Sequence, residues 1–100
     1  MYATYLPIFR EMRKTEDRTV FKAAAAEIKA QRARLDISQE ELAHRADVHR
    51  CFVARLEVAQ TQPSLAVFLR LADALEVDPA DMVKSIVKRL KKERKTVPSD

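Results

Sequence analysis

The absence of glycine constrains this chain more than any other feature of its sequence. None of the 100 residues is glycine, and asparagine is absent as well. Glycine-rich phosphate-binding loops and tight hairpins with an Asn-Gly turn are therefore excluded, which disfavours most nucleotide-binding enzyme classes. About half of the residues are Ala, Leu, Glu, Lys or Arg, which favour helices. We therefore expect one domain with an all-α fold.

The cysteine content narrows the class of protein further. A single cysteine, Cys51, forms neither an internal disulfide nor a cysteine-rich zinc site, which fits a reducing cytosol. His44, Asp47 and His49 precede it, but these residues are spread over two expected helices and a turn. We therefore expect no metal and no cofactor. No Ser, His and Asp residues have a spacing typical of catalysis, so we expect that the chain is not an enzyme.

Charge and hydropathy favour a cytoplasmic protein with an anionic partner. The first 14 residues have no leading positive charge, and Pro7 interrupts their short apolar stretch, so they do not form a signal peptide. No segment approaches the ~18 apolar residues that a membrane span needs. The net charge is +4 and the sequence pI is about 9.5, values that favour binding to an anion.

The chain divides into three parts: an amino-terminal extension (residues 1–18), a compact helical block (19–79), and a basic amphipathic helix with a tail (80–100). In the block, the periodicity predicts a first helix that is capped by Thr19, ends over 34–36 and carries Glu27 between its apolar positions. Asp78 and Pro79 open the last helix, which extends to about residue 95. Ser64 caps the helix before it, whose inner face is expected to hold Leu65, Phe68, Leu71, Ala72 and Leu75.

Residues 38–58 contain the pattern of two short helices joined by a tight turn. Ser38-Gln39-Glu40-Glu41 is a capping box, in which the serine oxygen accepts from a backbone amide and Glu41 reaches back. Asp47 falls where the chain must turn, and aspartate tolerates the left-handed conformation better than most residues. Because His49 is a poor capping residue, we expect Asp47 to cap the second helix, over 49–58. The buried positions that define this helix-turn-helix are Ala43, Val48, Val53 and Leu56.

Several motifs follow one another over residues 20–83. They are Ile28-x-x-x-Arg32, Ser38-Gln39-Glu40-Glu41-Leu42-Ala43, Val53, Leu56-Glu57, Pro63-Ser64-Leu65 and Leu71-Ala72-x-Ala74-Leu75-x-Val77. In this order and spacing, the sequence resembles the lambda-repressor-like, Xre/Cro family of helix-turn-helix DNA-binding domains. The resemblance implies a five-helix fold of that type. Asp47 and Ala59 depart from the family, which usually has glycine at both positions; a positive φ at Ala59 would cost ~1 to 2 kcal/mol.

The resemblance also implies which residues meet DNA. The second short helix lies in the major groove, with Arg50 and Cys51 at the principal base-reading positions and Arg55 one turn further on. Gln39, at the start of the first short helix, contacts a base or a phosphate. Arginine offers a bidentate fork to guanine, which predicts G·C pairs in each half-site. Contacts to the DNA backbone are expected from Ser38, His49, Gln60, Thr61 and Gln62.

Two further sets of residues are expected to act in structure and assembly. Arg32 and Glu57 stand where the family has a partly buried ion pair. Ile86, Val87 and Leu90 outrun the compact block, so we expect a second copy of the chain to cover them. They could instead pack against a partner protein or the apolar residues of the extension, Tyr5, Leu6, Ile8, Phe9 and Met12. The basic run over 84–95 is read as a solvated helix end, a phosphate-contacting arm or a site for partner acids.

The combined prediction is a small transcriptional regulator that binds a pseudo-palindromic operator in double-stranded DNA as a homodimer. Repression by occlusion of a promoter is favoured over activation, because the chain is small and has no separate sensor domain. The alternative is an antitoxin, which would bind DNA through the same block and a toxin through residues 1–18 or the carboxy-terminal helix. A helical scaffold that has lost DNA binding is a third interpretation.

Overall fold

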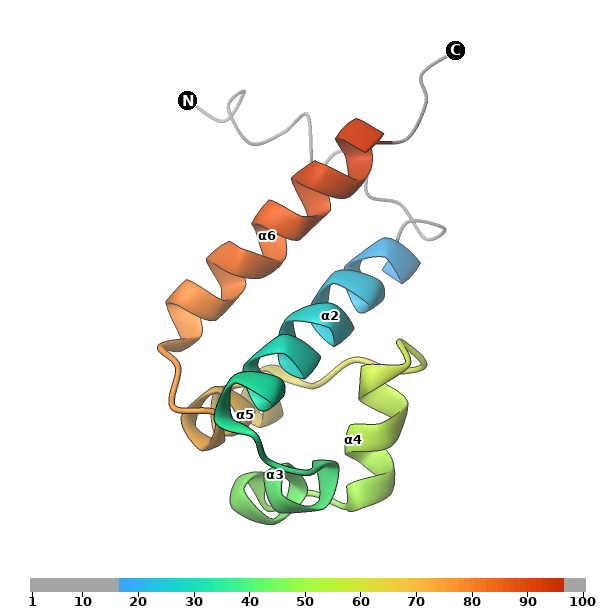
Figure 1. The fold of residues 1–100 in the computed structure, drawn as a ribbon. Helices are drawn as coiled ribbons and strands as arrows, with labels where there is room; N and C mark the ends of the chain where they lie inside the picture. The colour runs from blue at the N-terminus through green and yellow to red at the C-terminus, as the bar shows by residue number, and fades with distance from the viewer. Residues whose placement is uncertain (1–16, 97–100) are drawn as a thin grey trace.

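Five α-helices account for most of the residues that the structure describes. The computed structural model describes residues 17–96. The helices are α2 (Asp17–Leu35), α3 (Gln39–Ala46), α4 (Arg50–Glu57), α5 (Leu65–Ala74) and α6 (Pro79–Thr96), and no strand occurs in this range. The long helices α2 and α6 lie side by side, and α3, α4 and α5 gather around one end of α2 (Figure 1). The predicted all-α fold is confirmed.

Side chains at the helix starts explain most of the boundaries. Ser38 Oγ accepts a hydrogen bond from the Glu41 amide at 2.9 Å, and Ser64 Oγ accepts one from the Val67 amide at 3.1 Å, as predicted. The second half of the predicted capping box is absent, because the Glu41 carboxylate accepts from Arg45 Nε at 2.9 Å instead. The prediction for Thr19 was also wrong: α2 begins at Asp17, so Thr19 lies in its first turn. Residues 1–16, which make up most of the predicted extension and carry its apolar side chains, lie outside the described residues.

The four turns between the helices use one backbone motif without any glycine. Their left-handed residues are Asp36, Asp47, Ala59 and Glu76, with φ between 55° and 63°. At each of them the amide of the left-handed residue bonds a carbonyl three residues back, and the next amide bonds a carbonyl five residues back. This is the Schellman pattern that ends helices. Left-handed φ costs ~1 to 2 kcal/mol for residues other than glycine, so the chain accepts this strain four times.

Apolar side chains after these turns help to hold the left-handed conformation. Ile37, Val48 and Val77 directly follow Asp36, Asp47 and Glu76, and all three pack against the core. Such a contact commonly accompanies the Schellman motif. The turn at Ala59 is followed by the exposed Gln60 and gains no contact of this kind. The prediction that Asp47 adopts the left-handed conformation is confirmed. Ala59 also has a positive φ, the strained conformation that glycine usually takes at this position in the family.

The core is built from one face of every helix. Its largest fully buried side chains are Ile28, Leu42, Val53, Leu56, Leu71, Leu75 and Met82. Leu65 does not belong to it: this side chain was predicted on the inner face of α5, but it is 74% exposed. Leu65 is the first residue of α5, and the helix turns its buried face toward Phe68, Leu71 and Ala72 instead.

The apolar face of α6 packs against the chain itself from Met82 to Leu90, whereas only its first half was expected to do so. Ile86 and Leu90 belong to the hydrophobic core, and α6 makes extensive contact with α2. The prediction that these residues extend beyond the compact block was therefore wrong: α6 packs along α2, a contact that the periodicity of the two segments does not indicate. Val87 is half-buried beside them, and Val83, one turn before it, is exposed. Within residues 17–96, no helix has the length and apolar character that crossing a membrane requires.

A buried carboxylate joins these two long helices. Glu27 of α2 accepts hydrogen bonds from Arg89 Nε of α6 at 2.9 Å and from Gln31 Nε2 at 2.8 Å. Its side chain is 3% exposed, whereas that of Arg89 is 40% exposed. The sequence placed Glu27 only between the apolar positions of this helix. A buried carboxylate needs such partners, so the pair fixes the position of α6 along α2.

Candidate nucleic-acid interface

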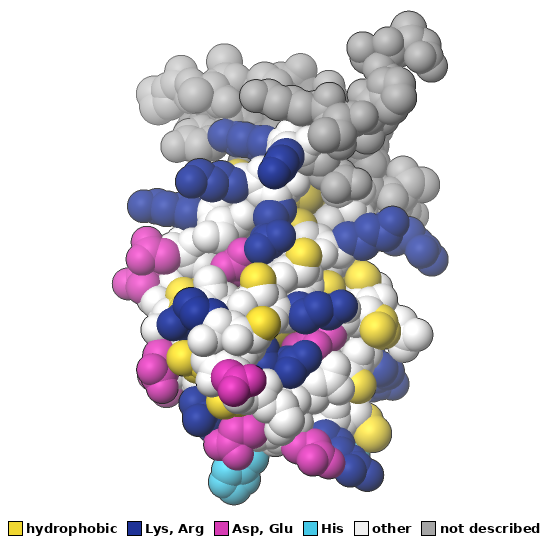
Figure 2. Space-filling model, in the orientation of Figure 1, with side chains coloured by type: hydrophobic (Ala, Val, Ile, Leu, Met, Phe, Trp, Pro, Cys, Tyr) yellow, Lys and Arg dark blue, Asp and Glu magenta, His cyan; other side chains and the backbone are white. Residues whose placement is uncertain are grey.

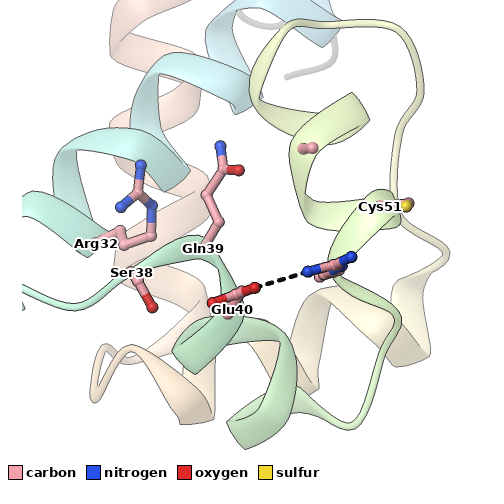
Figure 3. A pocket seen from close by; sticks show the side chains of 7 residues that line it. Arg32, Ser38, Gln39, Glu40 and Cys51 are labelled. Carbon is pink, nitrogen blue, oxygen red and sulfur yellow. Dashed lines mark hydrogen bonds and ion pairs between the residues drawn. The ribbon is translucent and has the colours of Figure 1, made fainter.

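A hollow of about 460 Å³ lies between the start of α3 and the start of α4. Figure 3 shows it with the side chains that line it. Helix α3 and the residue before it contribute Ser38, Gln39 and Glu40, and α4 contributes Arg50, Cys51 and Ala54; Arg32 of α2 completes the lining. Two of the four predicted base-reading residues thus lie on one side of the hollow, and a third, Gln39, lies opposite them.

The turn between α3 and α4 is fixed by its own backbone hydrogen bonds and by a side chain of α5. Asp47 ends α3 in the left-handed conformation, and its amide and that of Val48 bond the carbonyls of His44 and Ala43. Arg70 of α5 donates from Nε to the Ala46 carbonyl at 2.9 Å and from Nη2 to the Asp47 carbonyl at 3.4 Å. These bonds satisfy carbonyls that the end of a helix leaves without partners. These hydrogen bonds therefore fix the orientation of α3 relative to α4.

Helix α4 begins with an unexpected cap. His49 Nδ1 accepts a hydrogen bond from the Cys51 amide at 3.0 Å, and its backbone is extended, as at an N-cap. Asp47 does not cap α4, because it ends α3. The predicted roles of these two residues are corrected accordingly. An unprotonated imidazole nitrogen serves here as the acceptor that serine or aspartate usually supplies.

An ion-pair network lies behind the hollow and ties α2, α3 and α4 together. Arg32 donates to both oxygens of Glu57, from Nε at 2.7 Å and from Nη2 at 2.9 Å, and from Nη1 to the Ile37 carbonyl at 2.8 Å. Gln39 Nε2 donates to Glu57 Oε1 at 2.9 Å. The side chain of Glu57 is 1% exposed. The structure thus contains the Arg32–Glu57 pair that the resemblance implied, and it adds Gln39 to the pair.

The network changes the ionisation of both charged members. Burial by itself raises the pKa of the Glu57 carboxyl, but hydrogen bonds from Arg32 and Gln39 and the charge of Arg32 outweigh it. The pKa of Glu57 therefore lies below its ordinary value of 4.5. The hydrogen bond to Glu57 in turn raises the pKa of Arg32. Both groups are charged at neutral pH, and the buried Glu57 carboxylate accepts three hydrogen bonds.

Arg50 and Cys51 stand at the exposed start of α4. Arg50 Nη1 donates to Glu40 Oε2 of α3 at 2.8 Å, the contact that the dashed line marks in Figure 3. The side chains of Arg50 and Glu40 are 67% and 68% exposed. Cys51 is also exposed. Arg55 is exposed one turn further along α4, outside the lining of the hollow.

The loop after α4 brings its predicted residues to a different place. Gln60 is exposed and Thr61 is half-buried, and neither lines the α3–α4 hollow. Gln62 lines a second hollow, of about 340 Å³, between α2, α5 and α6. The structure therefore separates Gln62 from Arg50, although the sequence grouped both with the DNA contacts.

Sequence reasoning missed three residues that shape the interface. Glu40 was read only as an acid at a helix start, and its pairing with Arg50 was not expected. Ala54 lines the hollow because it follows Arg50 by one helical turn, a spacing that the sequence did contain. Arg70 lies 24 residues from Ala46 in sequence, and no local pattern indicates its contact with the turn.

Positive charge is distributed unevenly over the molecule. Figure 2 shows Lys and Arg side chains gathered over the upper part of α6, whereas acidic and basic side chains mix near the other end. The lysines of α6 with described side chains are Lys84, Lys88, Lys91 and Lys92, all exposed. The predicted basic run, over residues 84–95, lies within α6, and its described lysines are exposed. The charged residues that line the hollow are two arginines and one glutamate.

A comparison with family models matches residues 28–82 to the Helix-turn-helix model HTH_3. This match covers more than half of the chain and includes α3, the turn, α4 and α5. The chain belongs to this family of lambda-repressor-like, Xre-type DNA-binding transcriptional regulators. A search of curated protein sequences finds no significant match.

Solved structures of three regulators share the fold. The clp gene regulator ClgR from Corynebacterium glutamicum is 20% identical, with a TM-score of 0.71 over 75% of this chain and 80% of that one. The restriction-modification controller protein C.AhdI from Aeromonas hydrophila is 29% identical, with a TM-score of 0.60 over 62% and 94%. The controller protein C.Esp1396I is 17% identical, with a TM-score of 0.66 over 81% and 96%.

Proposed function

We propose that this chain represses transcription by binding a pseudo-palindromic operator in double-stranded DNA as a homodimer. The observation that carries the proposal is the position of Arg50 and Cys51 at the exposed start of α4, beside the hollow within the matched helix-turn-helix. Helices of this type place their first residues against base edges in the major groove. Arg50 then reads guanine, Cys51 makes a small apolar contact, and Arg55 contacts a third base further along.

Contacts to the DNA backbone come from the rims of the hollow. The start of α3, at Ser38 and Gln39, lies on one side. The first amides of a helix have no partner within it, and helix starts bind phosphate through such amides. His49 and the loop residues Gln60 and Thr61 supply contacts on the α4 side. Gln39 is engaged with Glu57, so its role at the DNA is to hold the start of α3 rather than to read a base by itself. Gln62 is not part of this surface, because it lines the second hollow.

The homodimer is proposed on the second hollow. Its lining is almost entirely apolar: Val20, Phe21, Ala24, Pro63, Leu65, Phe68, Val83, Ile86, Val87 and Leu90, with Gln62. Leu65 and Val83 on its rim are exposed, as is Leu69, one turn further along α5. A contiguous apolar surface of this kind commonly marks a protein interface. A second copy that covers it buries the side chains that the monomer leaves in solvent, and a two-fold dimer matches an inverted repeat.

Selection of bound duplexes from a random double-stranded library tests this proposal. We expect the wild-type chain to enrich an inverted repeat with G·C pairs in each half-site. In the Arg50→Ala variant, discrimination at one G·C position should fall by about 5- to 150-fold, which corresponds to ~1–3 kcal/mol for a bidentate contact. Lys84→Ala removes the same charge from the exposed face of α6 and should leave the motif unchanged. Enrichment of no motif by the wild-type chain would contradict the proposal, and a motif without internal symmetry would contradict the homodimer.

A further inference from the structure

Glu40 is an acidic residue in an unfavourable place for a protein that approaches DNA. It lies in the first turn of α3, lines the hollow between α3 and α4, and is more than two-thirds solvent-exposed. Its carboxylate pairs with Arg50 Nη1 across the two helices at 2.8 Å (Figure 3). A carboxylate at a protein–DNA interface lies close to the phosphates of the DNA. Salt screens charges only partly over a few ångströms, so the phosphates repel it.

Stability gives no sufficient reason for the pair. Ion pairs between exposed side chains contribute little to the free energy of unfolding. The angle between α3 and α4 is already fixed by Asp47, by Arg70 and by the Arg32–Glu57–Gln39 network. The pair therefore acts mainly on Arg50, the side chain that we propose reads a base.

The pair restricts what the Arg50 guanidinium can bind. A guanidinium has five N–H donors in one plane, and Glu40 occupies the Nη1 end. The edge formed by Nε and Nη2 stays available, and two parallel donors on one edge are what the O6 and N7 atoms of guanine accept. A guanidinium held in this way loses less conformational freedom when it meets a base. The nearby carboxylate also opposes contact between Arg50 and a phosphate.

We propose that Glu40 is a specificity-determining positioning residue, which holds Arg50 ready for guanine and keeps it from binding phosphate indiscriminately. The inference rests on the proposed function, since it concerns how the same site discriminates between DNA sequences. Its effect is a larger ratio of specific to non-specific affinity, obtained mainly by weakening the non-specific complex.

The variant Glu40→Gln tests the inference, because it keeps the shape of the side chain and removes its charge. The probes are a duplex selected by the wild-type chain and a scrambled duplex of the same base composition, each titrated over a range of salt concentrations. We expect affinity for the scrambled duplex to rise about 3- to 10-fold and its log–log salt dependence to steepen by about 0.9, the value for one additional phosphate contact. The ratio of specific to non-specific affinity should fall by a similar factor, about 3- to 10-fold, because affinity for the selected duplex changes little.

Two controls separate positioning from a general effect of charge or folding. Glu41→Gln removes the same charge one residue further along, from a carboxylate that pairs with Arg45 within α3 at 2.9 Å. It should change the ratio much less. In an Arg50→Ala background, Glu40→Gln should no longer alter the ratio, since the residue through which it acts is absent. Thermal melting of each variant verifies that the fold is retained.

The possible outcomes distinguish this inference from the proposed function. A wild-type chain that selects no duplex overturns the proposed function, and the role of Glu40 falls with it. A wild-type chain that selects a motif, with a ratio and salt dependence unaltered by Glu40→Gln, overturns the role of Glu40 alone. Equal effects of Glu40→Gln and Glu41→Gln also overturn it, because they identify a general charge effect.

Discussion

Replacement of Glu57 by glutamine is expected to lower the free energy of unfolding by about 3–5 kcal/mol. The glutamine has nearly the same shape, but it removes the negative charge from a carboxylate whose side chain is 1% exposed and which accepts hydrogen bonds from Arg32 and Gln39. Arg32 then keeps a partly buried charge without its partner. Because the network ties α2, α3 and α4 together, its loss should loosen the whole helix-turn-helix rather than change which DNA sequence is preferred.

Thermal or urea denaturation measures this effect. For a domain of this size, a loss of 3 kcal/mol lowers the melting temperature by more than about 10 °C. Glu40→Gln is the matched control: it removes the charge from an exposed ion pair and should leave the melting temperature close to that of the wild type. Equal melting temperatures for wild type and Glu57→Gln would show that the network does not stabilise the fold.

The same carboxylate predicts how stability depends on pH. The folded-state pKa of Glu57 lies below its ordinary value of 4.5, so the folded protein binds a proton at Glu57 less readily than the unfolded chain does. Its contribution is fully present above about pH 4.5 and is lost as the pH falls through the folded-state pKa. The stability of the wild type should therefore decrease more steeply below pH 4.5 than that of Glu57→Gln, and parallel curves would contradict this assignment.

The second large effect is expected at the contact between the two long helices. Arg89→Ala leaves the buried Glu27 carboxylate with Gln31 as its remaining side-chain partner. We expect a loss of about 3 kcal/mol, the lower end of the range for breaking a buried pair, because the Arg89 side chain is 40% exposed. Lys88→Ala removes the same charge from the adjacent exposed position and should change stability little. Equal losses in the two variants would contradict a specific role for the Glu27–Arg89 pair.

Much of the fold could be predicted from local sequence because its signals are local. Ser38 and Ser64 mark helix starts through hydrogen bonds that reach only three residues along the chain. Asp47 marks a helix end because its own backbone adopts a conformation that few residues tolerate. The Arg32–Glu57 pair joins residues far apart in sequence, and the prediction of it came from the family resemblance rather than from the pattern around either residue.

The remaining features depend on how the helices pack, which periodicity does not specify. Glu27 has the sequence context of a solvated helix residue, and only the approach of Arg89, 62 positions away, makes its burial tolerable. Ile86 and Leu90 were expected to need a second chain, because periodicity in the sequence does not show that α6 packs along α2. Leu65 has an apolar side chain at a helical spacing, yet the start of α5 leaves it in solvent.

The candidate site also combines features set by local sequence with features set by helix packing. The positions of Arg50 and Cys51 at the start of α4 follow from the cap and the turn, which are local. The environment of Arg50 does not, since Glu40 reaches it from another helix across ten residues of sequence. Sequence therefore predicts which residues stand at the start of α4, and the structure adds the side chains that surround them.

We propose that the start of α4 lies against DNA, and Cys51, the only cysteine in the sequence, allows a direct measurement of this contact. Cys51 is exposed there, so a maleimide reagent should alkylate it readily in the free protein. We expect a duplex selected by the protein to slow this reaction in proportion to the fraction of protein bound, whereas a scrambled duplex at the same concentration should slow it much less. An unchanged rate of alkylation with the selected duplex fully bound would show that the DNA lies on another face of the molecule and that α4 does not read it.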